Sequence, residues 1–322
     1  MKQILKFLII ILVISGCSTH NKNLVQFDKL FWPDMVNPKI ALVDIINMQK
    51  IRENYSFFRK FFGLEHEIQP LYRPFAVAAN DEYVAVSDIM FGVIYLINKN
   101  NFKLRIIKSI NNKRFKSIVD LDFADNDLYM VDSENNIIIK YNVIDEASKV
   151  IDVQLEKPVS IKVDIKNHLI FLADTKRNKI IVTDLGGNII KEFDKYFNFP
   201  LDVDIIPEEK ILFVLDSMNF RVLKLDYDGN LIGEFGEIGN RPGNFSKPKG
   251  LCIDKFHRVY ITDADFDNFQ IFDEKGNLLY FIGQNGSDEV SFYMPARVYC
   301  YKDEIYVSDL FNSRVKVFKS FR

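Results

Sequence analysis

Histidine and cysteine are scarce in this chain, which has four histidines and three cysteines among 322 residues. A catalytic or structural zinc ion usually needs three or four such side chains brought together. His168 and His257 lie in predicted turns, whereas His20 and His66 lie outside the regular part of the chain. The histidines therefore give no support for a zinc site, and no metal ligands are assigned from the sequence.

The chain also lacks an excess of positive charge. Its 42 lysines and arginines face 44 aspartates and glutamates, for a formal charge of −2. Proteins that bind nucleic acid usually have a clear basic excess, so we expect no nucleic-acid partner. The sequence has no phosphate-binding glycine loop and no pattern that pairs a serine with histidine and aspartate. No catalytic residue is therefore assigned.

Long apolar runs are confined to the start of the chain. Lys2 and Lys6 precede the run Phe7 to Ile14, which is too short to span a bilayer stably. The run leads into Ile14-Ser15-Gly16-Cys17, which resembles the lipobox of bacterial lipoproteins. That resemblance implies that residues 1–16 are a signal peptide and that Cys17 carries acyl chains such as palmitate. An ordinary secretory signal, or a buried apolar segment with a chance cysteine, is the alternative.

Lipidation at Cys17 would make the membrane the first partner of the mature chain. Each buried methylene contributes about 0.8 kcal/mol, so two or three acyl chains anchor firmly. We therefore expect a location in the bacterial cell envelope. In a Gram-negative cell, Ser18 after the lipid cysteine favours the outer over the inner membrane.

Six short apolar segments end in aspartate at nearly constant spacing. The intervals between successive aspartates are 44, 42, 42, 47 and 46 residues. A period in the forties with several strands per unit is typical of a β-propeller. The prediction is an all-β fold with six blades, whose repeated aspartates are Asp88, Asp132, Asp174, Asp216, Asp263 and Asp309.

The repeats resemble the NHL-repeat family over most of residues 72–322. The strongest matches are Pro248 to Asp254 with Val259 to Asp263, and the glycine-rich connector from Phe235 to Pro248. The family's Asn-x-Arg after the aspartate is present in blades four and six as Asn219, Arg221, Asn312 and Arg314. It is absent from blades one and two, and the opening glycine of a blade is kept only at Gly250. The resemblance implies a six-bladed propeller and leaves the function open.

Blade six lacks residues for its outer strand, because the chain stops at Arg322. We expect residues 39–46 to supply that strand and to close the ring, since closure removes an exposed sheet edge. Apolar positions at helical spacing then predict one short helix over about residues 48–62. That helix packs on the propeller or, alternatively, lies on the membrane surface. The predicted division is a signal at 1–16, a tether at 17–38 and a propeller at 39–322.

The repeated aspartates have two interpretations. A ring of carboxylates could hold calcium, as in some lactonase-like propellers. A single ion, however, does not need six equivalent copies. We therefore predict a structural role, in which each side chain accepts a hydrogen bond from the backbone of its own turn. No cofactor is predicted, with calcium as the alternative.

Non-repeated side chains in the loops after the second strands are the predicted binding residues, because loops on a fixed scaffold often carry binding. They are Arg73, Lys176, Arg177, Arg221, Asp265, Asp267, Arg297 and Arg314. The cations among them predict an acidic ligand. The same reasoning predicts that Arg221→Glu with Arg314→Glu abolishes binding without unfolding the protein.

Cys252 and Cys300 lie in the predicted innermost strands of neighbouring blades. Counted from the prolines that open those strands, they differ in parity, so they would face opposite sides of their sheets. A disulfide remains an alternative, but this parity favours two buried thiols.

The functional prediction is a lipid-anchored envelope protein that binds or scaffolds a protein, peptide or glycan, with the oligomeric state left open. The first alternative is a metal-dependent lactonase or lyase at the mouth of the central channel. The second is a structural component of the envelope. We favour binding over catalysis, because no catalytic constellation can be found in the sequence.

Overall fold

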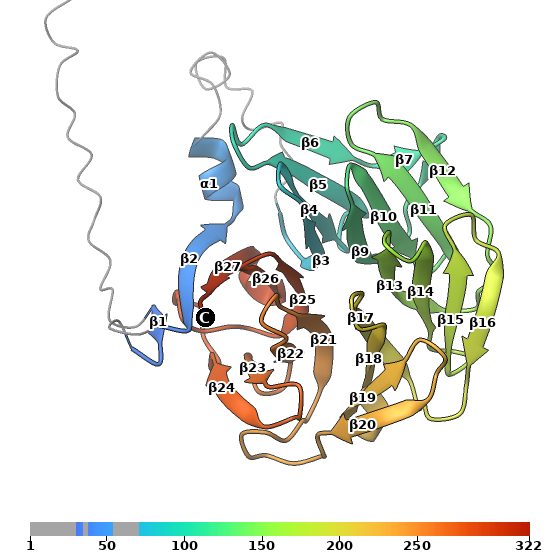
Figure 1. The fold of residues 1–322 in the computed structure, drawn as a ribbon. Coiled ribbons are helices and arrows are strands. Elements are labelled where there is room, and N and C mark those ends of the chain that lie inside the picture. Colours follow the sequence, from blue (N-terminus) through green and yellow to red (C-terminus); the bar gives the residue numbers. More distant parts are fainter. Residues whose placement is uncertain (1–29, 35–37, 54–70) are drawn as a thin grey trace, which may run out of the picture.

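Six antiparallel sheets form the blades of a ring in this computed structural model, which describes residues 30–34, 38–53 and 71–322. Five blades have four strands each, and blade six has five. The first strand of every blade lies nearest the centre, and the six first strands contact one another in a ring (Figure 1). The all-β, six-bladed prediction is confirmed.

The strands follow the chain from the centre outward within each blade. Blade one comprises β3 (Pro74–Ala79), β4 (Tyr83–Asp88), β5 (Val93–Asn98) and β6 (Leu104–Ile107); blade two comprises β9 (Ile118–Ala124), β10 (Asp127–Asp132), β11 (Ile137–Asn142) and β12 (Ser148–Ile151). Blade three comprises β13 (Pro158–Asp164), β14 (Leu169–Asp174), β15 (Lys179–Asp184) and β16 (Ile189–Phe193).

The remaining blades repeat this order. Blade four comprises β17 (Pro200–Ile206), β18 (Ile211–Asp216), β19 (Arg221–Asp226) and β20 (Leu231–Phe235), with the 3-10 helix η3 (Ser217–Asn219) after β18. Blade five comprises β21 (Pro248–Ile253), β22 (Val259–Asp263), β23 (Asn268–Phe272) and β24 (Leu278–Ile282). Blade six comprises β25 (Pro295–Tyr301), β26 (Glu304–Asp309), η4 (Leu310–Asn312) and β27 (Arg314–Ser320), completed by strands from the N-terminal side of the chain.

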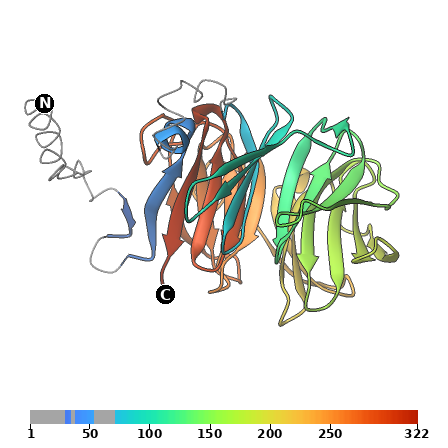
Figure 2. The ribbon, with the colours of Figure 1, turned by 90° about the horizontal axis from the view of Figure 1, so that it is seen from above.

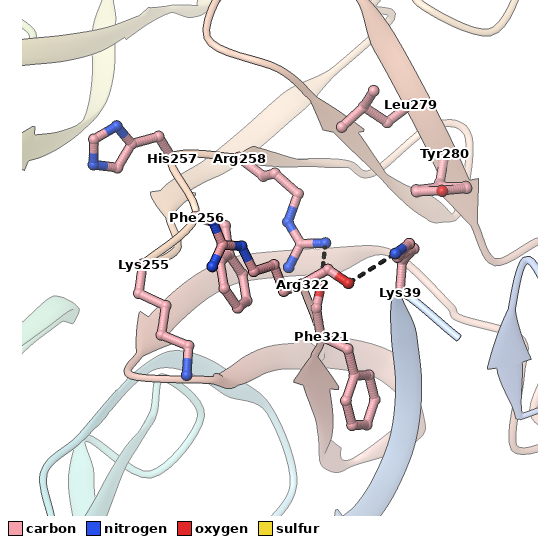
Figure 3. A pocket seen from close by; sticks show the side chains of 9 residues that line it. All are labelled: Lys39, Lys255, Phe256, His257, Arg258, Leu279, Tyr280, Phe321 and Arg322. Atoms are coloured by element: carbon pink, nitrogen blue, oxygen red, sulfur yellow. Dashed lines mark hydrogen bonds between the residues drawn. The ribbon is translucent and has the colours of Figure 1, made fainter. Parts of the chain in front are cut away.

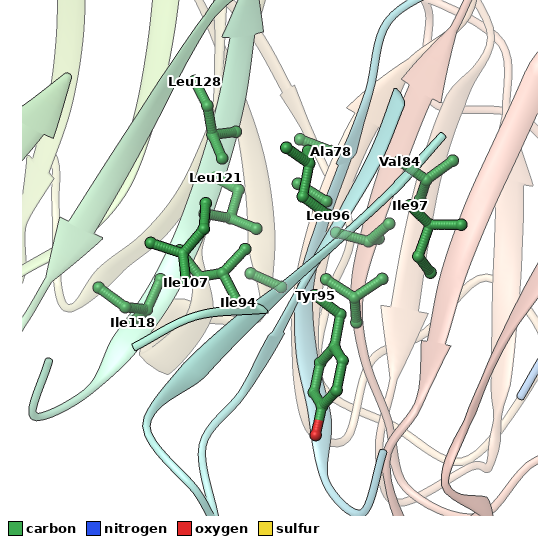
Figure 4. Close-up of a cluster of buried hydrophobic side chains, with 14 of the residues drawn as sticks. Ala78, Val84, Ile94, Tyr95, Leu96, Ile97, Ile107, Ile118, Leu121 and Leu128 are labelled. Atoms are coloured by element: carbon green, nitrogen blue, oxygen red, sulfur yellow. The ribbon is translucent and has the colours of Figure 1, made fainter. Parts of the chain in front are cut away.

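Position within a blade explains the composition of each strand. A third strand such as β5, Val-Ile-Tyr-Leu-Ile-Asn, is buried at every residue, because neighbouring sheets cover both of its faces. An outer strand such as β16, Ile-Ile-Lys-Glu-Phe, is largely exposed. Figure 4 shows the apolar layer in which side chains of blade one, such as Ile94, meet Leu121 and Leu128 of blade two.

Blade six is completed by β2 (Ile40–Ile46), which pairs antiparallel with β27. Ile40 lies opposite Ser320 and Ile46 opposite Val315, with a bulge between Leu42 and Asp44. Figure 2 shows blue β2 beside the red strands of blade six. A further short strand, β1 (Phe31–Trp32), pairs with the outer side of β2. The predicted N-terminal strand closure is thus confirmed.

One short helix, α1 (Met48–Glu53), follows β2, as predicted. Ile51 is fully buried in the apolar cluster of blades one and two, so the described part of the helix packs on the propeller. The predicted continuation to residue 62 lies outside the described residues. Within the described ranges, no helix has the length and apolar character needed to cross a membrane.

The ring has two distinct faces. We call the side where the second strands end at the repeated aspartates the aspartate face; the connectors into each first strand lie there too. The opposite side carries the turns between first and second strands and the hairpins between third and fourth strands, and we call it the turn face. A small hairpin, β7 (Ser109–Ile110) with β8 (Lys113–Arg114), interrupts the connector from blade one to blade two.

Cys252 of β21 and Cys300 of β25 form a disulfide, with their Cα atoms 5.6 Å apart. The expectation of two free thiols was wrong, and the reason is geometric. Neighbouring blades pack face to face, so residues on opposite sides of their own sheets point toward each other. The two inner strands approach closely beside this bridge: a Cβ on Gly250 would lie 2.8 Å from the backbone nitrogen of Val298.

Candidate binding site

The six repeated aspartates are almost completely buried, and each binds the backbone just before the first strand of its own blade. Asp174, for example, accepts hydrogen bonds from the N–H groups of Glu156 and Lys157 at 2.8 and 3.0 Å. The corresponding donors are Tyr72 and Arg73 for Asp88, Lys116 and Ser117 for Asp132, Asn198 for Asp216, Ser246 and Lys247 for Asp263, and Tyr293 for Asp309. Each carboxylate thus ties the start of the first strand to the end of the second.

The Asn-x-Arg motif completes this arrangement in blades four and six. Asn219 Nδ2 and Arg221 Nε donate to the Asp216 carboxylate at 2.7 and 3.1 Å. Arg314, which is 9 % exposed, donates to Asp309 at 2.7 Å. Reversing both arginines would place carboxylates against Asp216 and Asp309. Loss of folding is therefore the expected result, contrary to the prediction from sequence that only binding would be lost.

Other predicted binding residues also have partners within the protein. Arg177 donates to Asp174 at 3.0 Å, and Lys176 forms an ion pair with Glu156 at 3.0 Å. Buried Asp267 accepts the N–H of Met294 at 2.6 Å and therefore holds the connector into blade six.

Asp265 and Arg73, like Lys176, lie at the surface of the aspartate face. Asp265 is exposed and lies 3.7 Å from Lys247. The guanidinium of Arg73 lies 5.2 Å from the centre of the Phe311 ring, and no carboxylate among the described residues forms an ion pair with it. The structure therefore does not bring the predicted cations together around an opening.

Arg297 lies in the central channel and closes it. Its side chain is 3 % exposed and pairs with Asp202 at 2.8 Å. The guanidinium also donates to backbone carbonyls of four other blades, those of Val119, Val159, Leu201 and Lys249. A cation held in this way is a structural group in the axis of the propeller and not a free binding residue.

Two Asp-x-Asp pairs on inner strands surround the same axis. Asp120 and Asp122 of β9 accept backbone N–H groups of β13 at 2.8 Å, and Asp202 and Asp204 of β17 do the same for β21. Lys162 lies 3.3 Å from Asp122 and 3.2 Å from Asp204. The sequence contained a signal for this network, since polar residues alternate with apolar ones in both inner strands.

The charges in the channel influence one another. Burial raises the pKa of Asp120 to about 7, because the opposing effect of Arg297 is smaller and nearby Asp202 adds to the shift. Burial alone would lower the pKa of Lys162, but the carboxylates of Asp122 and Asp204 outweigh it and raise that pKa. These contacts, with a remaining void of only about 20 Å³, leave no room for a ligand.

Three potential metal ligands meet on the turn face: Glu209, His257 and Glu274, whose ligand atoms lie within 4.8 Å of one another. It is the one such group in the part of the chain that the structure describes. The Lys224 ammonium lies 3.0 Å from Glu274, and His257 Nδ1 lies 2.8 Å from the same carboxylate. Because a cation already neutralises Glu274, this cluster is a weak candidate for a metal site.

A cleft of about 740 Å³ opens on the turn face between blades five and six (Figure 3). The turn between β21 and β22 forms one side, and the ends of β2 and β27 form the other. Its lining contains five basic and three aromatic side chains, one leucine and no aspartate or glutamate: Lys39, Lys255, Phe256, His257, Arg258, Leu279, Tyr280, Phe321 and Arg322.

The cations of the cleft differ in whether they have a partner within the protein. Arg258 is held by the buried Asp254 carboxylate at 2.6 Å, and Lys39 Nζ donates to a main-chain oxygen of Arg322 at 2.7 Å. The side chains of Lys255 and Arg322 are exposed, and neither forms an ion pair with a described residue. Lys255 and Arg322, together with Lys39 and Arg258, give the cleft an excess of basic side chains over acidic ones. The sequence signal was the run Lys255-Phe256-His257-Arg258, which includes the predicted turn residue His257.

No family model matches the chain, and no curated protein matches it in sequence. Solved structures do share its fold. Virginiamycin B lyase from Staphylococcus aureus is 12 % identical, over 88 % of this chain and 100 % of the lyase, with a TM-score of 0.60. A protein of unknown function from Bacteroides thetaiotaomicron is 13 % identical over 77 % of this chain and 69 % of that one, with a TM-score of 0.63.

An auxiliary nutrient binding protein from Bacteroides thetaiotaomicron is also similar. It is 10 % identical, over 76 % of this chain and 68 % of that one, with a TM-score of 0.62. Likeness at such low identity shows the fold alone, because propellers carry many unrelated activities. The chain is therefore similar in architecture to six-bladed β-propeller proteins that include both a lyase and a nutrient-binding protein.

Proposed function

We propose that this chain is a lipid-anchored, NHL-type propeller of the bacterial cell envelope that binds an acidic protein, peptide or glycan in the cleft between blades five and six. The observation that carries the proposal is the excess of cations in that cleft. Lys255 and Arg322 have no ion pair with a described residue, whereas Arg177, Arg221 and Arg314 on the aspartate face are all paired.

The aromatic side chains of the cleft support the same proposal. Phe256 lies beneath two cations: Lys255 Nζ is 5.2 Å and the Arg258 guanidinium 4.9 Å from the ring centre. Arginine and aromatic residues are enriched in binding surfaces, where rings offer apolar area at low entropic cost. A partner with carboxylates spaced along an apolar or sugar backbone would match both features.

The proposal can be tested with a fluorescein-labelled hexaglutamate peptide and a labelled oligogalacturonate, each compared with an uncharged counterpart. We expect the protein to bind the acidic probes more tightly, with affinity that falls as salt rises. Lys255→Glu with Arg322→Glu should weaken binding about tenfold or more. Lys275→Glu reverses an exposed charge on a hairpin of the same face outside the cleft and should have little effect.

A different result would favour a different site. Binding that is unchanged in the cleft variant but lost in Arg73→Glu would locate the site on the aspartate face instead. The predicted alternative, a metal-dependent lactonase or lyase at the channel mouth, has less support, because the one group of potential metal ligands among the described residues is Glu209, His257 and Glu274, next to the Lys224 ammonium. Binding therefore remains the function that the geometry supports best.

A further inference from the structure

A second cavity, of about 500 Å³, lies between the β7–β8 hairpin and the outer half of blade two. It is separate from the cleft of the proposed function, and no residue lines both. The hairpin that covers it is inserted in the connector from blade one to blade two. The cavity therefore exists because of a feature that the repeat itself does not require.

The floor of this cavity is apolar. Ile137 and Ile139 of β11 are two residues apart and so lie on one face of the sheet, and Val150 of β12 lies directly opposite Ile139. Val150 is 42 % exposed, whereas Ile139 opposite it is buried. Buried Ile110 and Phe115 from the hairpin segment line the cavity as well. An apolar surface of this kind favours an apolar ligand group over water.

The rim of the cavity is basic. Lys113, Arg114 and Lys116 line it, all three are exposed, and none forms an ion pair with a described residue. The single acidic residue of the lining, Asp132, is buried, and its oxygens accept the N–H of Lys116 at 3.0 Å and Asn135 Nδ2 at 2.8 Å. The Asp132 carboxylate is thus occupied by these donors and forms no ion pair with the three cations.

We propose that this cavity binds an amphipathic anion, meaning a compact apolar body with one carboxylate at its end, of the kind represented by a medium-chain fatty acid. The apolar body lies on Ile137, Ile139 and Val150, and the carboxylate meets Lys113 and Arg114. An uncharged ligand would leave the three cations without a partner. A cationic amphiphile would be repelled by them. A cavity of this size matches one small ligand.

Isothermal titration with decanoate, decanol and decyltrimethylammonium tests the proposal, since the three share an alkyl chain and differ in charge. We expect decanoate to bind, and the other two to bind about tenfold more weakly or not at all. Lys113→Glu with Arg114→Glu should remove the preference for decanoate. Val150→Asp should also weaken decanoate binding about tenfold, because it places a carboxylate on the apolar floor of the cavity.

Lys149→Glu is the matched control. It reverses an exposed charge on the neighbouring residue of β12, whose side chain points to the other face of the strand, and it should leave decanoate binding unchanged. The substituted lysines, arginine and valine are all exposed, and unchanged thermal melting of each variant verifies that it is folded. Equal binding of decanol and decanoate, or decanoate binding unaffected by Val150→Asp, would overturn the proposal.

Discussion

Asp174 shows how much a repeated residue can contribute when its carboxylate is fully buried. It accepts two backbone N–H groups and the Arg177 side chain. Asp174→Ala leaves these donors unpaired, and we expect a loss of about 2–4 kcal/mol in the free energy of unfolding. Asp174→Asn turns one acceptor oxygen into a donor and should cost about 1–2 kcal/mol.

Urea unfolding of the two variants measures these differences. The exposed Asp265, on the same face, provides a control: Asp265→Ala should change stability by less than about 0.5 kcal/mol. Equal stability of wild type and Asp174→Ala would contradict the structural role.

Asp120 predicts a specific pH dependence. Burial raises its pKa to about 7 in the folded protein, above the ordinary value of 3.8. The folded state therefore holds the proton more tightly than the unfolded state does. The contribution of Asp120 to the free energy of unfolding is present below about pH 4 and is lost as pH rises toward 7. The loss is no more than about 1.4 kcal/mol per pH unit.

Asp120→Asn keeps an acceptor for the Ile161 N–H without the titration. The variant should lose less stability than wild type between pH 5 and 7 and should be the more stable protein at pH 8. Urea titrations at several pH values measure the difference. Parallel curves for the two proteins would show that Asp120 does not titrate in this range.

The Asn-x-Arg motif shows why residue-level reasoning selected arginines that are paired within the protein. Arg221 and Arg314 were selected as binding residues because they are cations in loops. Their recurrence at the same position of two blades was the better signal, since a repeated residue more often serves the repeated fold. The cleft cations Lys255 and Arg322 do not recur, but no local pattern shows that the ends of β2 and β27 lie beside the β21–β22 turn. That proximity depends on ring closure.

At the scale of the elements, the disulfide joins the inner strands of blades five and six across 48 residues of sequence. Removing a native disulfide usually costs about 2–4 kcal/mol, so Cys252→Ala with Cys300→Ala should lower stability by that order. Mass spectrometry after alkylation without reduction should find no reactive thiol in protein prepared with Cys17→Ser. Two alkylated cysteines would contradict the pairing.

The closing strand should be essential for a single folded species. Deleting residues 39–46 exposes the edge of β27 and the apolar cluster around Ile40, which is fully buried. We expect the truncated protein to self-associate in sedimentation velocity and to melt without a sharp transition.

Two alanine substitutions in the closing strand give a milder test of its role. Ile40→Ala should lower the free energy of unfolding by about 2–5 kcal/mol. Val43→Ala, at a residue that is 52 % exposed, should be nearly neutral.

At the scale of the whole molecule, the lipid anchor remains a prediction, because Cys17 lies outside the described residues. Cells labelled with an alkyne fatty acid should incorporate the label into wild type and not into Cys17→Ser. The variant should also leave the membrane fraction, since the acyl chains on Cys17 are the predicted anchor. Equal labelling of both proteins would refute lipidation at this residue.

The architecture could be predicted from sequence because a propeller repeats the same pattern of strands and turns six times. A weak signal in one blade is therefore reinforced by the others. The closure by β2 followed from counting strands. Cys252 and Cys300 were misjudged because parity was compared within separate sheets and not across the interface between them. The channel contacts of Arg297 join five blades and could not be inferred from any one of them.

The contacts of Arg297 also affect how the propeller unfolds. In a repeat protein, each unit normally contacts only its neighbours, so terminal units can unfold while the others persist. Arg297 connects blade six directly to blades two, three and four, which are not adjacent to it in the ring. Loss of any one of these blades therefore removes an acceptor from a buried cation. The consequence is cooperativity: hydrogen exchange in the inner strands should converge on a single opening free energy, that of the entire ring.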